Sequence, residues 1–95
     1  MYVSQVDFQF DPAQAEKLVE MATVFVQELR NLPGCRQVMV VLTARDTARS
    51  IVAYRTRVEA EAASSFVADF FARVAPHLIV MPQREIYPVL FYQRF

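Results

Sequence analysis

The sequence has very little glycine, cysteine or histidine, and each shortage excludes a class of site. Its 95 residues include one of each. A single glycine, Gly34, rules out the loops that cradle phosphates in dinucleotide-binding and P-loop folds, because those loops need several glycines at fixed spacing. One cysteine forms no internal disulfide, and one cysteine with one histidine is too few for an ordinary transition-metal site unless carboxylates or a second subunit complete it. We therefore expect no cofactor, whether a metal or a nucleotide.

The chain also lacks net charge and long apolar runs. Ten basic side chains balance ten acidic ones, which leaves no excess positive charge for nucleic acid or an anionic membrane surface. The longest apolar runs, Val38 to Leu42 and Leu78 to Met81, have about a quarter of the length of a membrane span. The first residues show no secretion signal. We expect a cytoplasmic protein with no nucleic-acid or membrane partner.

Hydrophobic residues are abundant and follow regular patterns. They make up 55% of the chain, enough for one compact domain over residues 1–95, because two domains would need roughly 200 residues. Polar and apolar residues alternate from Tyr2 to Phe10, which predicts a strand. Asp11-Pro12 is typical of a helix start and Pro33-Gly34 of a helix end. The predicted elements are a strand at 2–10, a helix from 11 to about 31, a hairpin of strands at 35–43 and 50–56, a helix at 59–75 and a strand at 84–95.

The β-α-β-β-α-β order predicts an α+β, ferredoxin-like fold. Right-handed crossovers place both helices on one face of a four-stranded antiparallel sheet with strand order 4-1-3-2. The strands near Val38 to Leu42 and Tyr87 to Tyr92 then form the two edges. Pro88 agrees with an edge position, because proline donates no hydrogen bond to a central ladder.

These edges are unusually apolar for an isolated subunit. Val38, Val40 and Leu42 would lie on one face of their strand and Met39 and Val41 on the other. An open edge of this kind promotes aggregation, and a chain of this length buries only a modest share of its surface alone. We therefore predict a homodimer with sheets face to face, which forms a dimeric α/β barrel.

One family shares this pattern of segments. The first strand ends in Asp11-Pro12, the long helix is closed by Leu32-Pro33-Gly34-Cys35, and a strand follows that turn. In this respect nearly the whole chain resembles the dimeric α/β-barrel superfamily, and within it the antibiotic biosynthesis monooxygenase-like group. Members are small and usually dimeric. They include enzymes that oxidise aromatic polyketides with molecular oxygen and without metal or flavin, and others with no known activity.

The chain departs from this group in two respects. Family oxygenases often carry a tryptophan and an asparagine near the end of the third strand, but this chain has no tryptophan and its only asparagine, Asn31, closes the first helix. Haem-degrading relatives add a histidine ligand on the second helix, whereas His77 follows Pro76 beyond the predicted helix. Haem degradation is therefore disfavoured.

The resemblance implies a cofactor-independent monooxygenase for a small aromatic or polyketide-like substrate. The alternatives are a non-catalytic module of the same fold that binds a small aromatic or apolar molecule, and a cyclase- or isomerase-like barrel with a His or Tyr as acid and base.

Four polar residues are candidates for catalysis. Asp7 would act as a general base if burial raised its pKa. Tyr54 and Arg55, where family pockets open, would steady a substrate anion. His77 would move a proton near neutral pH. The alternative for Asp7 is a role as ion-pair or hydrogen-bond partner, and for Tyr54 and Arg55 it is packing and a surface ion pair. For His77 the alternative is a solvated position in a loop.

Four phenylalanines are candidates for substrate binding. Phe66, Phe70 and Phe71 on the second helix, facing Phe25 on the first, would line an aromatic pocket between helices and sheet. Core packing is the alternative for all four. Phe71 lies at the margin of the apolar stripe, so a ligand or a partner chain is a further possibility for it.

Overall fold

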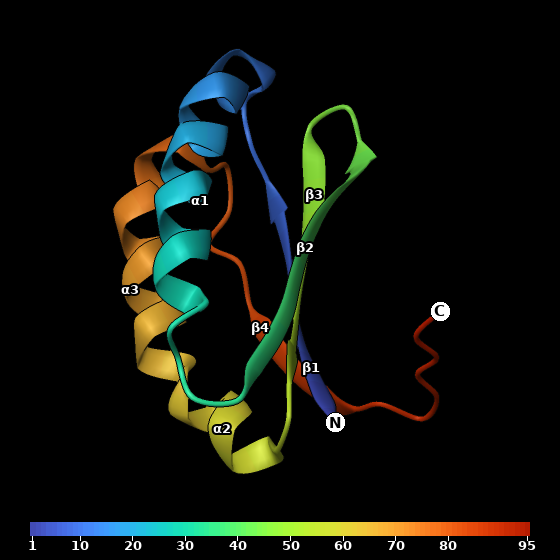
Figure 1. Ribbon diagram of the computed structural model, residues 1–95. Helices are drawn as coiled ribbons and strands as arrows, with labels where there is room; N and C mark the ends of the chain where they lie inside the picture. The colour runs from blue at the N-terminus through green and yellow to red at the C-terminus, as the bar shows by residue number, and fades with distance from the viewer.

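The computed structural model describes residues 1–95, and its elements follow the predicted order. They are β1 (Tyr2–Gln9), a 3-10 turn η1 (Pro12–Gln14), α1 (Ala15–Leu29), β2 (Cys35–Ala44), β3 (Thr47–Tyr54), α2 (Arg57–Ala62), α3 (Ser64–Val74), a second 3-10 turn η2 (Ala75–His77) and β4 (Arg84–Pro88). The four strands form one antiparallel sheet in the order β2-β3-β1-β4. All helices cover the same face of this sheet (Figure 1). The ferredoxin-like α+β fold and the edge positions of β2 and β4 are confirmed.

The hydrophobic core lies between the helices and the helix-facing side of the sheet. Val6 of β1 and Val52 of β3 are each 3% exposed, and Leu29 of α1 is completely buried. The ring of Phe25 stacks on that of Phe70, with centroids 4.0 Å apart, and on that of Phe66 at 5.3 Å. Apolar side chains at helical spacing on α1 and α3 therefore meet alternate side chains of the central strands, as their periodicities require.

The second helix differs from the prediction because it is divided at Ala63. The sequence predicts one helix from 59 to 75, whereas α2 and α3 are separate. The guanidinium of Arg84 donates to the Ala60 carbonyl oxygen at 2.7 Å and to Ser64 Oγ at 2.8 Å. This side chain from β4 ties down the backbone at the junction of the two helices. The helix also begins two residues earlier than predicted, because Thr56 caps it.

The last strand is shorter than predicted. It ends at Pro88, which pairs with Tyr2, the first residue of β1. Beyond this point β4 has no neighbouring strand, and Val89 N–H donates to the Met1 carbonyl oxygen as the last backbone bond between them. Residues 89–95 leave the sheet on the side opposite the helices (Figure 1).

No helix in this fold is long and apolar enough to cross a lipid bilayer.

Candidate functional site

A large apolar cavity lies between α1 and the helix-facing side of the sheet, close to the β2 edge. Its volume is about 640 Å³. Eleven of its thirteen lining side chains are hydrophobic, and the other two are Thr23 and Gln27. The lining residues are Phe8, Phe10, Ala15, Leu18, Val19, Ala22, Thr23, Val26, Gln27, Val40, Val41, Leu42 and Ala48. None of them titrates near neutral pH.

The cavity arises because the apolar stripe of α1 is wider than the core beneath it. Phe25 and Leu29 fill the core, whereas Val19 on the β2 side of the helix is 66% exposed. Opposite Val19, the β2 side chains Val40 and Leu42 are 49% and 68% exposed. Two apolar surfaces therefore face each other without filling the space between them, and such a concave surface is typical of small-molecule sites.

A second, much smaller cavity of about 50 Å³ adjoins the first and shares five lining residues with it: Phe8, Leu18, Ala22, Val26 and Val40. Three of the predicted aromatic residues, Phe25, Phe70 and Phe71, line this smaller space, and Phe66 does not. None of the four lines the large cavity. Their ring stacking is that of a packed core.

Phe71 packs in the core of its own subunit, although its position in the sequence left a ligand or a partner chain open as its contact. Its side chain is 8% exposed. Its ring centroid lies 5.9 Å from that of Phe8 and 5.4 Å from that of Phe70. The position at the margin of the helical stripe turns this ring toward β1 and away from solvent.

Tyr54 is buried at the far end of the sheet from the β2–β3 turn, beneath α2. Its side chain is 0% exposed, and its hydroxyl lies 3.5 Å from Nη2 of Arg84. The guanidinium carbon of Arg84 is 5.9 Å from the centroid of the Tyr54 ring. Burial raises the pKa of the phenol above its ordinary value, and the neighbouring Arg84 only partly offsets this. Tyr54 does not line the large cavity.

Arg55 and Asp7 are exposed and take part in ion pairs. Arg55 Nε and Nη2 each donate to the carboxylate of Glu59 at 3.2 Å. Arg49 Nε donates to Oδ1 of Asp7 at 2.7 Å, which raises the pKa of the guanidinium. Neither Arg55 nor Asp7 lines the large cavity. Tyr54 is buried in the core, whereas Arg55, just beyond the end of β3, is exposed and bound to Glu59, so the two side chains do not meet at one site.

His77 does not line the large cavity either, but it contacts a residue next to it. Its Nδ1 is 2.9 Å from Oε1 of Gln14, next to the cavity residue Ala15. The following residue, Leu78, forms a bridge with Phe10, which also lines the cavity. In the neutral tautomer whose Nδ1–H donates to the Gln14 amide oxygen, Nε2 keeps its lone pair.

The structure gathers no group of three or more His, Cys, Asp or Glu side chains that could hold a metal ion. Burial raises the pKa of the Cys35 thiol, which makes it a weaker nucleophile near neutral pH.

Solved structures share this architecture over nearly the whole chain. A monooxygenase from the gene ActVA-Orf6 of Streptomyces coelicolor, in complex with the ligand Nanaomycin D, superposes with a TM-score of 0.75 at 23% identity, covering 99% of this chain and 92% of that one. A Nitrosomonas europaea protein, provisionally named an antibiotic biosynthesis monooxygenase, gives a TM-score of 0.78 at 20% identity over 96% and 100%. A Deinococcus radiodurans protein with the same provisional name gives 0.82 at 12% identity over 100% and 98%.

The chain shares the ferredoxin-like fold of these solved structures. The structural neighbours thus confirm the resemblance that the sequence indicates. No family model matches the sequence, and no curated protein matches it either. The likeness is therefore one of fold, and the assignment of function depends on the cavity.

The sequence predicts a pocket between helices and sheet, but neither its position near the β2 edge nor the residues that line it. One signal in the sequence did point to it: Val19, Ala22 and Val26 extend the apolar face of α1 beyond the positions that a core helix needs, and the β2 segment opposite them is apolar on both faces.

Proposed function

We propose that the protein binds a small aromatic or polyketide-like molecule in the large cavity and oxidises it with molecular oxygen, without metal or flavin. The apolar cavity between α1 and β2 is the observation that carries this proposal. Its volume of about 640 Å³ is of the size that small-molecule sites usually have. The ligand-bound Streptomyces coelicolor monooxygenase, which has the same fold, supports it.

In this proposal the substrate supplies its own reactivity. Loss of a proton from an activated ring CH₂ leaves an electron-rich carbanion, which transfers electrons to O₂. One oxygen atom forms a new C=O bond on the substrate, and the other leaves as water together with the two hydrogens of the CH₂ group. The apolar lining would orient the ring and exclude water, which would otherwise protonate the carbanion.

None of the four candidate residues lines the cavity. We assign the first proton transfer to His77, because Gln14, which holds its ring, precedes the cavity residue Ala15, and Leu78, which follows it, pairs with the cavity residue Phe10.

Tyr54 is buried beneath α2, and Arg55 and Asp7 are held in ion pairs with Glu59 and Arg49. We therefore give none of these three residues a contact with the substrate.

A second candidate function is binding without catalysis. It is favoured by the absence of any titratable side chain among the residues that line the cavity.

The proposed functional unit is a cytoplasmic homodimer with sheets face to face. Support comes from the sheet face that the helices leave open, where Met39 and Tyr87 are 45% and 46% exposed. Apolar side chains on an uncovered sheet face are typical of an interface.

Oxygen uptake by the purified protein against anthrones, hydroquinones and related phenols tests the enzymatic proposal. We expect protein-dependent uptake and a product that has gained one oxygen atom and lost two hydrogens. Binding of the same compounds with no uptake would leave only the second candidate function. Neither uptake nor binding would contradict both.

A matched pair of variants tests the location of binding. Ala22→Phe would fill the space shared by the two cavities, whereas Val24→Phe adds the same ring at a position of α1 that is 56% exposed and outside both. We expect Ala22→Phe to weaken binding at least about tenfold, and Val24→Phe to leave it unchanged. Equal effects of the two variants, measured by fluorescence or calorimetric titration, would contradict this location.

A further inference from the structure

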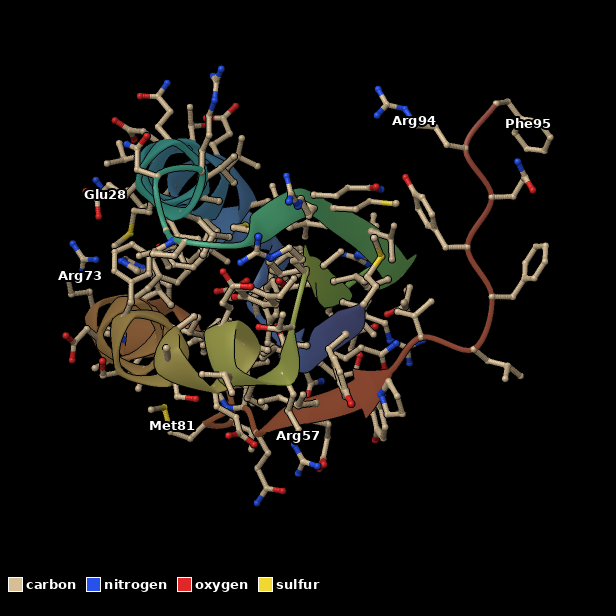
Figure 2. All side chains as sticks on the ribbon, turned by 60° about the horizontal axis from the view of Figure 1, so that its bottom comes forward. Glu28, Arg57, Arg73, Met81, Arg94 and Phe95 are labelled. Atoms are coloured by element: carbon tan, nitrogen blue, oxygen red, sulfur yellow. The ribbon has the colours of Figure 1, made fainter.

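The C-terminal tail, residues 89–95, makes almost no contact with its own domain. Residues 90–95 form no backbone hydrogen bond with it. Leu90, Phe91 and Phe95 are 101%, 80% and 112% exposed. Figure 2 shows Arg94 and Phe95 on a segment that stands apart from the rest of the chain. Three large apolar side chains on one short extended segment, all in solvent, are far more than scattered surface residues and indicate a binding segment.

A second unpartnered feature lies at the other edge of the sheet. β2 pairs only with β3, so the other side of its backbone is free over a strand of ten residues. The side chains along this edge are apolar, with Met39, Val40 and Leu42 between 45% and 68% exposed. An open edge that is long and apolar is a ready surface for an added extended segment.

The tail is short enough to lie along this edge, but the two are poorly placed to meet within one chain. Seven extended residues reach about 23 Å, well within the span of β2, which is about 33 Å. In one chain, however, the tail starts at β4, and β1 and β3 separate β4 from β2, a distance of about 14 Å across the sheet. The tail stands off the open face of the sheet (Figure 2), and residues 90–95 form no backbone hydrogen bond with β2.

A second copy removes this separation. When two identical sheets face each other and the two-fold axis runs along the strands, the β4 edge of one sheet lies over the β2 edge of the other. Facing sheets are about 10 Å apart, a gap that the tail spans easily. Each tail leaves its sheet on the open face, where such a partner would sit.

We infer that the tail of each protomer binds along the free edge of β2 in a second copy of this chain. The inference rests on the homodimer proposed above and adds to it an exchange of tails. In this arrangement the exposed apolar side chains of the tail pack against β2 of the partner. Because Val40 and Leu42 of β2 also line the large cavity, each tail would lie beside the ligand site of its partner.

Two measurements on three variants test this exchange. One variant ends at Pro88, the second carries Phe91→Ser and Phe95→Ser in the full chain, and the control carries Val58→Ser, at an α2 side chain that is 74% exposed. Since all the changed side chains are exposed, each variant is expected to fold, and circular dichroism checks this. Sedimentation equilibrium gives the dimer dissociation constant, and hydrogen exchange reports on the amides of residues 36–42.

For both tail variants we expect the dimer dissociation constant to rise at least about tenfold and exchange at residues 36–42 to accelerate by a similar factor. The Val58→Ser control should match the parent protein. If the parent is a dimer and the tail variants leave both quantities unchanged, the tail exchange is wrong but the dimer stands. Weaker dimers with unchanged exchange at residues 36–42 would place the tail elsewhere and also overturn the inference. A monomeric parent protein would contradict both the dimer and the exchange.

Discussion

Gly34 explains why the Leu-Pro-Gly-Cys turn has its sequence. Its φ is +76°, a left-handed conformation that other residues rarely adopt, and an added Cβ would collide with the carboxyl group of Glu59. That carboxyl group cannot easily move, because Arg55 and Thr56 hold it. The carbonyl oxygen of Gly34 also accepts a bond from Arg55 N–H at 2.8 Å. The turn that carries the sequence resemblance therefore joins α1 and β2 to the start of α2.

Replacing this glycine should destabilise the fold. We expect Gly34→Ala to lower the free energy of unfolding by about 2 kcal/mol, through left-handed strain and the clash with Glu59. In a Glu59→Ala background the same substitution should cost less, because the clash is gone. Urea denaturation measures both costs, and a Gly34→Ala protein as stable as the parent would contradict this account of the turn.

Tyr54 should titrate late and make the fold sensitive to alkali. The ordinary phenol pKa is 10.0, and burial raises that of Tyr54 in the folded state. Above about pH 10 the unfolded chain therefore loses this proton while the folded chain keeps it, so the free energy of unfolding falls as pH rises. In Tyr54→Phe this loss disappears, although the missing hydroxyl beside Arg84 should cost about 1 kcal/mol at neutral pH.

Ultraviolet titration of phenolate absorbance checks this prediction. The chain has four tyrosines, and one of them should titrate only as the protein unfolds. If the Tyr54→Phe protein lost stability in alkali as steeply as the parent does, burial of this phenol would not be the cause.

At the scale of elements, the start of α2 depends on a reciprocal cap. Thr56 Oγ1 accepts a hydrogen bond from Glu59 N–H at 3.2 Å and donates one to Glu59 Oε1 at 2.8 Å. The hydroxyl of Thr56 is the main cause that lowers the pKa of the Glu59 carboxyl. The lowered value means that the folded state favours the ionised carboxyl, so its stabilising effect is present above the ordinary pKa of 4.5 and is lost as pH falls below it.

We expect Thr56→Ala to lower the free energy of unfolding by about 1 kcal/mol at neutral pH, and Thr56→Ser to retain most of the stability. The difference between Thr56→Ala and the parent should shrink as the pH falls below 4.5, because protonation of Glu59 weakens the same cap. Denaturation curves at neutral and acid pH measure it. A difference independent of pH would show that Glu59 takes no part.

The elements were predictable where the decisive interactions are local. Alternation in β1, the proline and glycine after α1 and the polar break between β2 and β3 are sequence signals, and the strand order follows from the order of elements. The division at Ala63 was not predictable, since it depends on Arg84, which is distant in sequence. The end of β4 at Pro88 depends on where β1 begins, which the residues of β4 do not encode.

At the scale of the whole molecule, the candidate site was harder to predict than the fold. Strand alternation alone could have separated Tyr54 from Arg55. The cavity, by contrast, results from the distance between α1 and the β2 edge. Val19 and Leu42 line it from opposite sides, and no side chain fills the space between them. Such a mismatch between packed elements is a property of the tertiary structure. The same is true of the tail, whose exposure becomes visible only once the sheet is seen to end before it.

The central claim is that this cavity holds a small aromatic molecule, and chemical-shift mapping by NMR tests it most directly. A chain of 10.9 kDa, or its dimer, is small enough for every backbone amide to be followed while an anthrone is added. The account predicts that the largest shifts fall on the α1 residues around Ala22 and Thr23 and on Val40 to Leu42 of β2. Shifts centred on Tyr54 and Arg84, or no saturable shifts with any compound of the panel, would contradict it.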